Sequence, residues 1–175
     1  WKGYLDIIDA IDRARHEYPQ ILHLGIGNGP QQEELQQEID KRGLNDHFIL
    51  TGWMNRKHVP AIFKLSKGFI HAAQLEPFGF VIAEAMAYKT PMISTKTGAA
   101  GDVLENMKSA YLFDYSDISE SILKGIRHVL ENDPTEMTEN AFMAFQNNFQ
   151  FKKCGQVMLS YLNALQNDKT KHIQH

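Results

Sequence analysis

The chain's 175 residues are enough to bury the core of one ordinary domain, and 43% hydrophobic with 22% charged residues excludes a disordered or fibrous protein. The formal net charge of -3 at pH 7 excludes a basic surface that would attract nucleic acid or anionic lipid. The single cysteine, Cys154, excludes an intrachain disulfide framework and favours a cytoplasmic location, and no apolar run is long enough to span a membrane.

The first part of the chain alternates between predicted helices and predicted strands. Residues 4–17 place Leu5, Ile8 and Ile11 at helical spacing, and the apolar run 21–26 predicts a buried strand that closes in a glycine-rich loop. The elements that follow are a helix within 31–44, a strand within 47–53, a helix within 55–66, a strand within 68–73, a helix over 80–88, a strand within 91–95 and a short strand within 110–114. In a parallel α/β sheet a strand normally precedes a helix such as 4–17. We therefore expect such a strand upstream, in a longer protein.

Three further helices are predicted over 118–131, 137–147 and 152–166, and a polar tail follows over 167–175. This order predicts an α/β fold of the Rossmann-like type, with a doubly wound, mostly parallel sheet, helices on both faces and extra C-terminal helices. We expect a single domain over 1–166. Ligands of such folds bind beyond the carboxyl ends of the strands, which here carry the loops 25–30, 52–55, 72–79 and 95–101.

Two carboxylates stand out in the segment "LEPFGFVIAEAMAY", where Glu76 precedes the predicted helix and Glu84 lies inside its apolar stretch. The amides of Phe78, Gly79 and Phe80 would be unpaired donors at the positive end of this helix, which suits an oxyanion or a diphosphate. A buried carboxylate needs hydrogen-bond donors, and the two hydroxyls of a ribose supply them. The ordinary alternative is that Glu84 reaches solvent or pairs with a lysine and that Glu76 is a loop carboxylate. Spacing alone leaves both interpretations open.

The longer segment "EPFGFVIAEAMAYKTPMISTKTGAAGDVLE" resembles the donor-binding segment of retaining glycosyltransferases of the GT-B fold, family 4 (group 1). These proteins share two glutamates separated by seven residues within "E-x-F-G-x-x-x-x-E-A-M-A", followed by "P-V-I", a glycine-rich loop and an acidic residue. The upstream stretches "KGYLDIIDAI", "GIGNGP" and "FILTGW" are similar to further blocks of the family. The resemblance covers residues 2–117.

The resemblance implies a catalytic role for two residues. Glu76 would contact the donor sugar near the reacting centre. Lys2 would bind the diphosphate and stabilise it as a leaving group, which is a preorganised electrostatic role. The family's diphosphate clamp usually includes an arginine just upstream of this lysine, on the strand that we expect outside this chain.

The resemblance also implies a set of donor-binding residues. Glu84 would bind the ribose hydroxyls, and the backbone amides of the "PFGF" stretch would hold the sugar or its diphosphate. Loop residues on the other predicted strands would flank the nucleoside and complete the site. The donor-binding residues are Glu84, Phe78, Gly79, Phe80, Gly27, Trp53, Met54 and Gly98.

Three positions depart from the family pattern. The serine that usually precedes the first glutamate is Ala73 here, so its hydroxyl contact is absent. The usual Gly-Gly pair of the later loop is Gly98-Ala99, and the acidic residue after it is Asp102 where glutamate is usual. These differences affect details of the loops.

The resemblance implies a glycosyltransferase that moves a hexosyl group from a nucleotide-diphosphate sugar to a glycan or other hydroxyl acceptor with retention of configuration. It implies no metal and no cofactor besides the donor. The acceptor, a glycan, glycolipid or protein, would bind a separate N-terminal domain absent from this chain, and any peripheral membrane contact would run through that missing part. The chain alone should bind nucleotide but transfer nothing. The alternatives are a non-catalytic nucleotide-sugar-binding module and a GT-B epimerase or phosphorylase.

The histidines do not indicate a metal site. The chain contains eight, but none forms a His-x-x-x-His pair on a predicted helix or pairs with the cysteine. His71 ends a predicted strand close to the candidate site. We expect a hydrogen-bonded core residue there, with direct ligand contact as the alternative.

Overall fold

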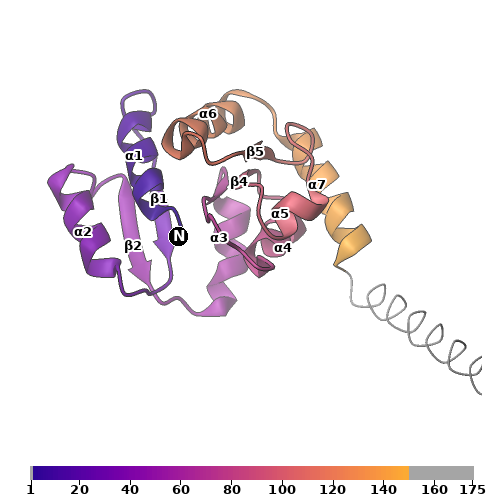
Figure 1. Cartoon of the computed structure of the whole chain (residues 1–175), viewed down its shortest axis with the longest axis horizontal. Coiled ribbons are helices and arrows are strands. Elements are labelled where there is room, and N and C mark those ends of the chain that lie inside the picture. Colours follow the sequence, from indigo (N-terminus) through magenta and orange to yellow (C-terminus); the bar gives the residue numbers. More distant parts are fainter. Residues whose placement is uncertain (1, 150–175) are drawn as a thin grey trace, which may run out of the picture.

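The computed structural model describes residues 2–149, and its strands form two parallel sheets (Figure 1). One sheet pairs β1 (His23–Ile26) with β2 (Phe48–Gly52). The other has the order β3 (Phe69–His71), β4 (Met92–Thr95), β5 (Tyr111–Phe113). Every one of these strands lies within a segment for which the sequence predicts a strand.

Helices connect and cover the strands. They are α1 (Tyr4–Ala14), α2 (Gln32–Lys41), the 3₁₀ turn η1 (Arg56–His58), α3 (Val59–Leu65), α4 (Phe80–Ala87), α5 (Ala99–Val103), α6 (Ile118–Glu131) and α7 (Thr135–Asn148). Asn55 caps η1, because its side chain accepts a hydrogen bond from the Lys57 amide. The predicted helix over 152–166, the tail and Cys154 lie outside the described residues.

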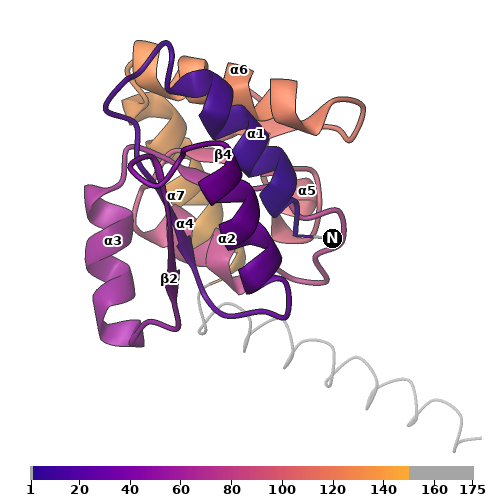
Figure 2. The same cartoon turned by 90° about the vertical axis from the view of Figure 1, so that its left-hand side faces the viewer.

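The core has two halves, one on each face of the β3–β5 sheet. Neighbouring strand residues point to opposite faces, so Ile93 packs with the apolar side chains of α1, α2 and α6, whereas Met92 packs with those of α3, α4, α5 and α7. The same alternation separates Phe113 from Leu112. Figure 2 shows α1 between α2 and α6. The predicted arrangement of a parallel sheet with helices on both faces is confirmed.

The division into two sheets differs from the single sheet that the sequence suggests. Within residues 2–149, β1 pairs only with β2, and β3 pairs only with β4, so each leaves one edge without a neighbouring strand. A groove of about 1650 Å³ separates these two edges and is lined by β1, β3 and apolar side chains of α1, α3 and α6. Lys2, Glu76 and Glu84 also line it, so the groove extends to the carboxyl ends of the strands.

One helix lies in a segment whose sequence predicts a loop. The short helix α5 follows Gly98 directly and has the sequence AAGDV. Five residues that include a glycine are too few to show helical periodicity, which explains why the pattern predicts only a loop. The helix buries Ala99 and Ala100 beneath the loop that precedes α4.

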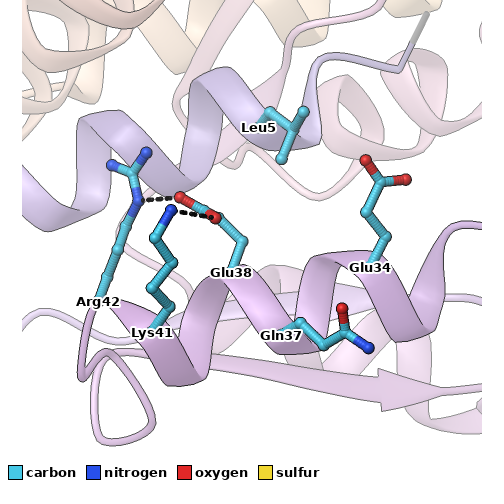
Figure 3. A pocket seen from close by; sticks show the side chains of 6 residues that line it. All are labelled: Leu5, Glu34, Gln37, Glu38, Lys41 and Arg42. Atoms are coloured by element: carbon cyan, nitrogen blue, oxygen red, sulfur yellow. Dashed lines mark hydrogen bonds and ion pairs between the residues drawn. The ribbon is translucent and has the colours of Figure 1, made fainter.

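A network of ion pairs fixes α2 against α1 beside a pocket of about 430 Å³. Figure 3 shows Arg42 and Lys41 reaching the carboxylate of Glu38, which points toward α1. The Arg42 guanidinium donates to Glu38 at 2.7 Å and to Asp9 of α1 at 2.9 Å. Ser119 of α6 donates a further hydrogen bond to Asp9, so this carboxylate joins three helices.

We expect the free energy of unfolding to fall as the pH drops below about 4. Hydrogen bonds from Ser119 and Arg42 hold the pKa of Asp9 below its ordinary 3.8, and Arg42 does the same for Glu38, whose ordinary value is 4.5. A carboxylate whose pKa is lower in the folded protein than its ordinary value stabilises the fold at pH values above that ordinary pKa. This stabilisation is lost as the pH falls through the lower pKa of the folded protein. Urea unfolding at pH 7, 4 and 3 measures the slope. Asp9→Asn should flatten it, and an unchanged slope in that variant would contradict this assignment.

Candidate functional site

The first element of the site is an ion pair between residues far apart in sequence. The Nζ atom of Lys2 lies 2.7 Å from Oε2 of Glu76. Gly3 makes this approach feasible because its φ is 71° and a Cβ there would lie 2.3 Å from the carbonyl oxygen of Ala72. The start of α1 therefore packs directly onto the loop that follows β3. The two residues predicted to be catalytic are brought together.

Charge at Glu76 is set by its neighbours. The hydrogen bond from Lys2 holds the pKa of Glu76 below its ordinary range, so the carboxylate stays ionised at neutral pH. Its side chain is 15% exposed and that of Lys2 is 53% exposed, so a ligand can reach the ammonium more easily than the carboxylate. Nε2 of His71 lies 3.6 Å from the same Glu76 oxygen.

Hydroxyl groups hold the backbone of the loop that carries Glu76. Thr95 at the end of β4 donates to the Ala73 carbonyl at 2.7 Å, and Thr97 donates to it at 3.2 Å. Tyr115 reaches across from beyond β5 and donates to the carbonyl of Gln74 at 2.8 Å. Ala73 has no hydroxyl of its own, but the hydroxyls of Thr95 and Thr97 donate to the Ala73 carbonyl.

Gly98 supports the second half of this loop. Its φ of 52° and ψ of −140° place it where side chains are strongly disfavoured, and a Cβ would lie 2.7 Å from the carbonyl oxygen of Glu76 and 2.8 Å from that of Phe78. The next amide, that of Ala99, donates to the Phe78 carbonyl at 2.8 Å. The loop after β4 thus packs on the loop after β3, and only glycine fits at the contact.

Gly98→Ala should therefore lower the free energy of unfolding by about 1–3 kcal/mol, because the variant adds both strain and a clash. It should also weaken ligand binding, since the displaced carbonyls belong to the loop that holds Glu76. Thermal unfolding followed by circular dichroism measures the first effect. Gly29→Ala is the matched control, because a Cβ at Gly29 has no neighbour within 4 Å and its φ is not positive. Equal stability of the two variants would contradict this account of the loop.

The N-terminus of α4 presents free backbone donors. Gly79 precedes the helix with φ 81°, and its carbonyl accepts from Ile82. Among residues 2–149, the amides of Phe78, Gly79 and Phe80 donate to no protein acceptor. Unpaired amides at the positive end of a helix attract an anion, as the sequence predicts. Two aromatic rings flank this point, with the Phe78 and Phe80 centroids 4.6 Å apart.

Glu84 lies on α4 and pairs with a residue that the sequence analysis did not identify. Nη2 of Arg56 lies 2.6 Å from Oε1 of Glu84, which joins the loop after β2 to the helix after β3. The Glu84 side chain is 31% exposed, so the structure agrees with the alternative in which it reaches solvent and pairs with a cation, although the cation is an arginine and not a lysine. The only signal for Arg56 is the basic "NRK" stretch after a strand, which any surface loop can carry.

The remaining predicted residues occupy the loops after β1 and β2. The amide of Gly27 donates to the carbonyl of Gly52 at 2.9 Å, which joins these two loops, and Trp53 and Met54 follow directly. Trp53 is 73% exposed. The groove between the sheets is lined by Lys2, Glu76, Glu84 and Gly27, while Trp53, Met54, Phe78, Gly79, Phe80 and Gly98 are not among its lining residues.

The described part of the chain contains neither a metal-binding cluster nor a membrane-spanning helix. No group of three His, Cys, Asp or Glu side chains among residues 2–149 is placed to hold a metal ion. None of the helices in that range is long and apolar enough to cross a membrane.

Known proteins similar to this chain are glycosyltransferases. The chain is 26% identical over 132 residues to a 2-deoxystreptamine N-acetyl-D-glucosaminyltransferase of Niallia circulans. This match covers 75% of this chain and 34% of that protein. It is 25% identical over 153 residues to O-antigen chain mannosyltransferase C of Escherichia coli, and this match covers 85% of this chain and 40% of that protein. The chain thus spans well under half the length of these relatives.

Solved structures share the fold. The structure of HepE from Anabaena in complex with UDP-glucose superposes with a TM-score of 0.79 and 25% identity, over 94% of this chain and 46% of HepE. The C-terminal domain of a group 1 family glycosyl transferase (LpcC) from Francisella tularensis superposes with a TM-score of 0.76 and 23% identity, over 86% of this chain and 80% of that domain. The family model for glycosyl transferases group 1 matches residues 1–143. Because this match covers most of the sequence, the chain belongs to the glycosyl transferases group 1 family.

Proposed function

We propose that this chain is the donor-binding domain of a retaining glycosyltransferase, which transfers a hexosyl group from a nucleotide-diphosphate sugar to a hydroxyl acceptor. The observation that carries the proposal is that Lys2, Glu76 and Glu84 line one groove at the carboxyl ends of the strands, in a chain of this family. The cation and two carboxylates at this end of the groove match the phosphate and hydroxyl groups of such a donor.

The diphosphate of the donor binds between Lys2 and the N-terminus of α4. The Lys2 side chain is exposed, and the amides of Phe78, Gly79 and Phe80 have no protein acceptor among residues 2–149. A flexible ammonium and a set of fixed amides together stabilise the negative charge that builds up on the leaving diphosphate. No metal is needed in this arrangement, because the chain's own donors supply the positive potential.

The nucleoside and the sugar bind on opposite sides of that diphosphate. Glu84 accepts hydrogen bonds from the ribose hydroxyls, near the loops that contain Gly27 and Trp53. Glu76 accepts from hydroxyls of the hexose, near the carbon whose bond to phosphate breaks. A UDP-glucose complex is described for HepE, which is similar to this chain over 94% of its length, and this supports a nucleotide sugar as the ligand class.

The rest of the enzyme lies outside the described residues. The acceptor binds a second domain across the cleft from the donor. A strand from outside residues 2–149 fills the apolar part of the groove between β1 and β3 and joins the two sheets into one, which leaves the end lined by Lys2, Glu76 and Glu84 to the donor. Two facing strand edges with unpaired backbone groups, separated by an apolar groove at the start of α1, support this strand.

Calorimetric titration with UDP, GDP and ADP tests the proposed function. We expect one of the three to bind, with the other two at least tenfold weaker, and its hexose conjugate to bind at the same place. Competition between the nucleotide and its conjugate shows that they share a site. No binding of any of the three at millimolar concentration, in a protein shown to be folded by circular dichroism, would contradict the proposal.

A further inference from the structure

His71 is a buried titratable side chain to which the proposed function assigns no role. It ends β3, pairs in register with Ser94 of β4, and is 7% exposed. Its Nδ1 atom lies 3.4 Å from the Ser94 hydroxyl oxygen. Its Nε2 atom is buried, points toward Glu76 and has no hydrogen-bond partner among the described residues. A buried polar atom without a partner costs free energy, so this arrangement calls for an explanation.

The neighbours of the ring decide which nitrogen carries the proton. Ser94 donates its single hydroxyl proton to the Thr95 carbonyl at 2.9 Å, so the ring faces an acceptor on each side: the neutral Ser94 oxygen beside Nδ1 and the Glu76 carboxylate beside Nε2. Burial lowers the pKa of His71, which keeps the ring neutral with one N–H. A proton on Nδ1 would leave the Nε2 lone pair facing the ionised Glu76 carboxylate, which is repulsive. The charged carboxylate is the stronger acceptor of the two, so the proton belongs on Nε2, where it points at Glu76 across a gap slightly too long for a hydrogen bond.

Lys2 and His71 point at the same oxygen of Glu76. Oε2 accepts from Lys2 at 2.7 Å and lies 3.6 Å from Nε2 of His71. The proposed function requires Lys2 to bind the diphosphate, which removes the donor that now holds this carboxylate. Glu76 then needs another donor in order to keep one defined orientation toward the sugar. The only other side-chain donor that the structure places against Oε2, within residues 2–149, is His71.

We propose that His71 is a positioning residue that takes over Oε2 of Glu76 when Lys2 turns to the donor's diphosphate. This inference rests on the proposed function and assigns a further residue to it. A small movement of the carboxylate toward the ring closes the gap and satisfies the buried Nε2–H. The second oxygen, Oε1, then stays free for hydroxyls of the sugar. His71 acts through Glu76 and does not itself touch the donor.

Two substitutions separate this role from simple packing. In His71→Asn the amide replaces the Nδ1 side of the ring and leaves no donor toward Glu76, whereas in His71→Gln the longer amide places a donor where Nε2 stood. The measured quantity is the affinity for a nucleotide sugar divided by the affinity for the nucleoside diphosphate alone. UDP and UDP-glucose are the probes, or GDP and GDP-mannose if the titration above selects guanosine.

We expect His71→Asn to lower this ratio about tenfold, because a hydrogen bond to a charged group is lost, and His71→Gln to keep it within about twofold. The affinity for the nucleoside diphosphate alone should change little in either variant. A purely structural role would lower stability and both affinities in both variants. A wild-type ratio in His71→Asn would overturn the inference while leaving the proposed function intact. Failure of the wild-type protein to bind any nucleotide would contradict the proposed function itself, and the inference with it.

A measurement on the wild-type protein covers the case in which neither variant folds. With ¹⁵N-labelled histidine, the Nε2–H signal of His71 reports whether this proton is hydrogen-bonded. We expect the signal to move downfield and to exchange more slowly with water when UDP or GDP is added, because Glu76 then closes on the ring. A signal that stays unchanged at saturating nucleotide would overturn the inference.

Discussion

Replacing Glu84 by alanine should weaken binding of the nucleoside diphosphate at least tenfold. In the proposed site this carboxylate accepts from the two ribose hydroxyls, and hydrogen bonds to charged groups contribute about 1.5–3 kcal/mol each. The side chain is only partly exposed in the groove, so water replaces it poorly. Calorimetric titration of the wild-type chain and the variant measures the change. Glu33→Ala is the matched control, because Glu33 is an exposed glutamate on α2 that is not among the lining residues of the groove.

A 2′-deoxynucleotide sharpens this test. In the wild-type protein the missing hydroxyl should weaken binding, whereas in Glu84→Ala the ribose and deoxyribose nucleotides should bind alike, because the partner of that hydroxyl is gone. Arg56→Ala distinguishes the ion pair from the sugar contact. Arg56 donates to Oε1 of Glu84 and has no part in holding the ribose, so its removal should leave the ribose preference in place. A ribose preference that persists in Glu84→Ala would place the ribose elsewhere.

Replacing Lys2 by alanine should have the second large effect, and it should depend on the phosphates. The variant should lose about 10- to 100-fold in affinity for the nucleoside diphosphate and almost nothing for the nucleoside, because a charge-assisted contact to phosphate is removed. In an enzyme complete with its acceptor domain, turnover should fall about 10²–10³-fold, as expected when one stabilising donor is lost from a leaving group. Titration with UDP and with uridine checks the first part.

Lys57→Ala is the control for net charge, because Lys57 is an exposed lysine on η1. It should leave both affinities unchanged. If Lys2→Ala and Lys57→Ala behave alike, Lys2 contributes only to the general field of the protein, and its place in the site would be wrong. The Lys2 variant should also raise the pKa of Glu76 toward its ordinary value, since the Lys2 hydrogen bond is the largest cause of its lowering.

Most of the fold follows from local patterns in the sequence. The helical spacing of Leu5, Ile8 and Ile11 predicts α1, and the apolar runs predict the strands, because these periodicities depend only on neighbouring residues. The glycines at the strand ends mark the loops of the site in the same way. The helix α5 could not be predicted, since its five residues carry no period. The separation of the sheets could not be predicted either, because it depends on which strand edges meet in space.

Most residues of the candidate site could be predicted from the sequence, but the contacts between them could not. Glu76, Glu84 and Gly79 could be identified from a resemblance, which records positions but not contacts. The Lys2–Glu76 and Arg56–Glu84 pairs join residues 74 and 28 positions apart, and nothing local indicates either contact. The same holds for His71, whose sequence position suggests a core residue. Its burial is as expected, but only the structure shows that its free nitrogen faces Glu76.

The most direct test of the donor site is a nuclear magnetic resonance titration of the ¹⁵N-labelled chain with a nucleotide and its sugar conjugate. Backbone amides report where the ligand lies, and the loops of the site contain Gly27, Gly79 and Gly98. We predict that these three amides shift and saturate together, while amides around the pocket between α1 and α2, such as that of Gln37, stay in place. Shifts centred on the α1–α2 pocket, or an unperturbed Gly79 at saturation, would contradict a donor site at the carboxyl ends of the strands.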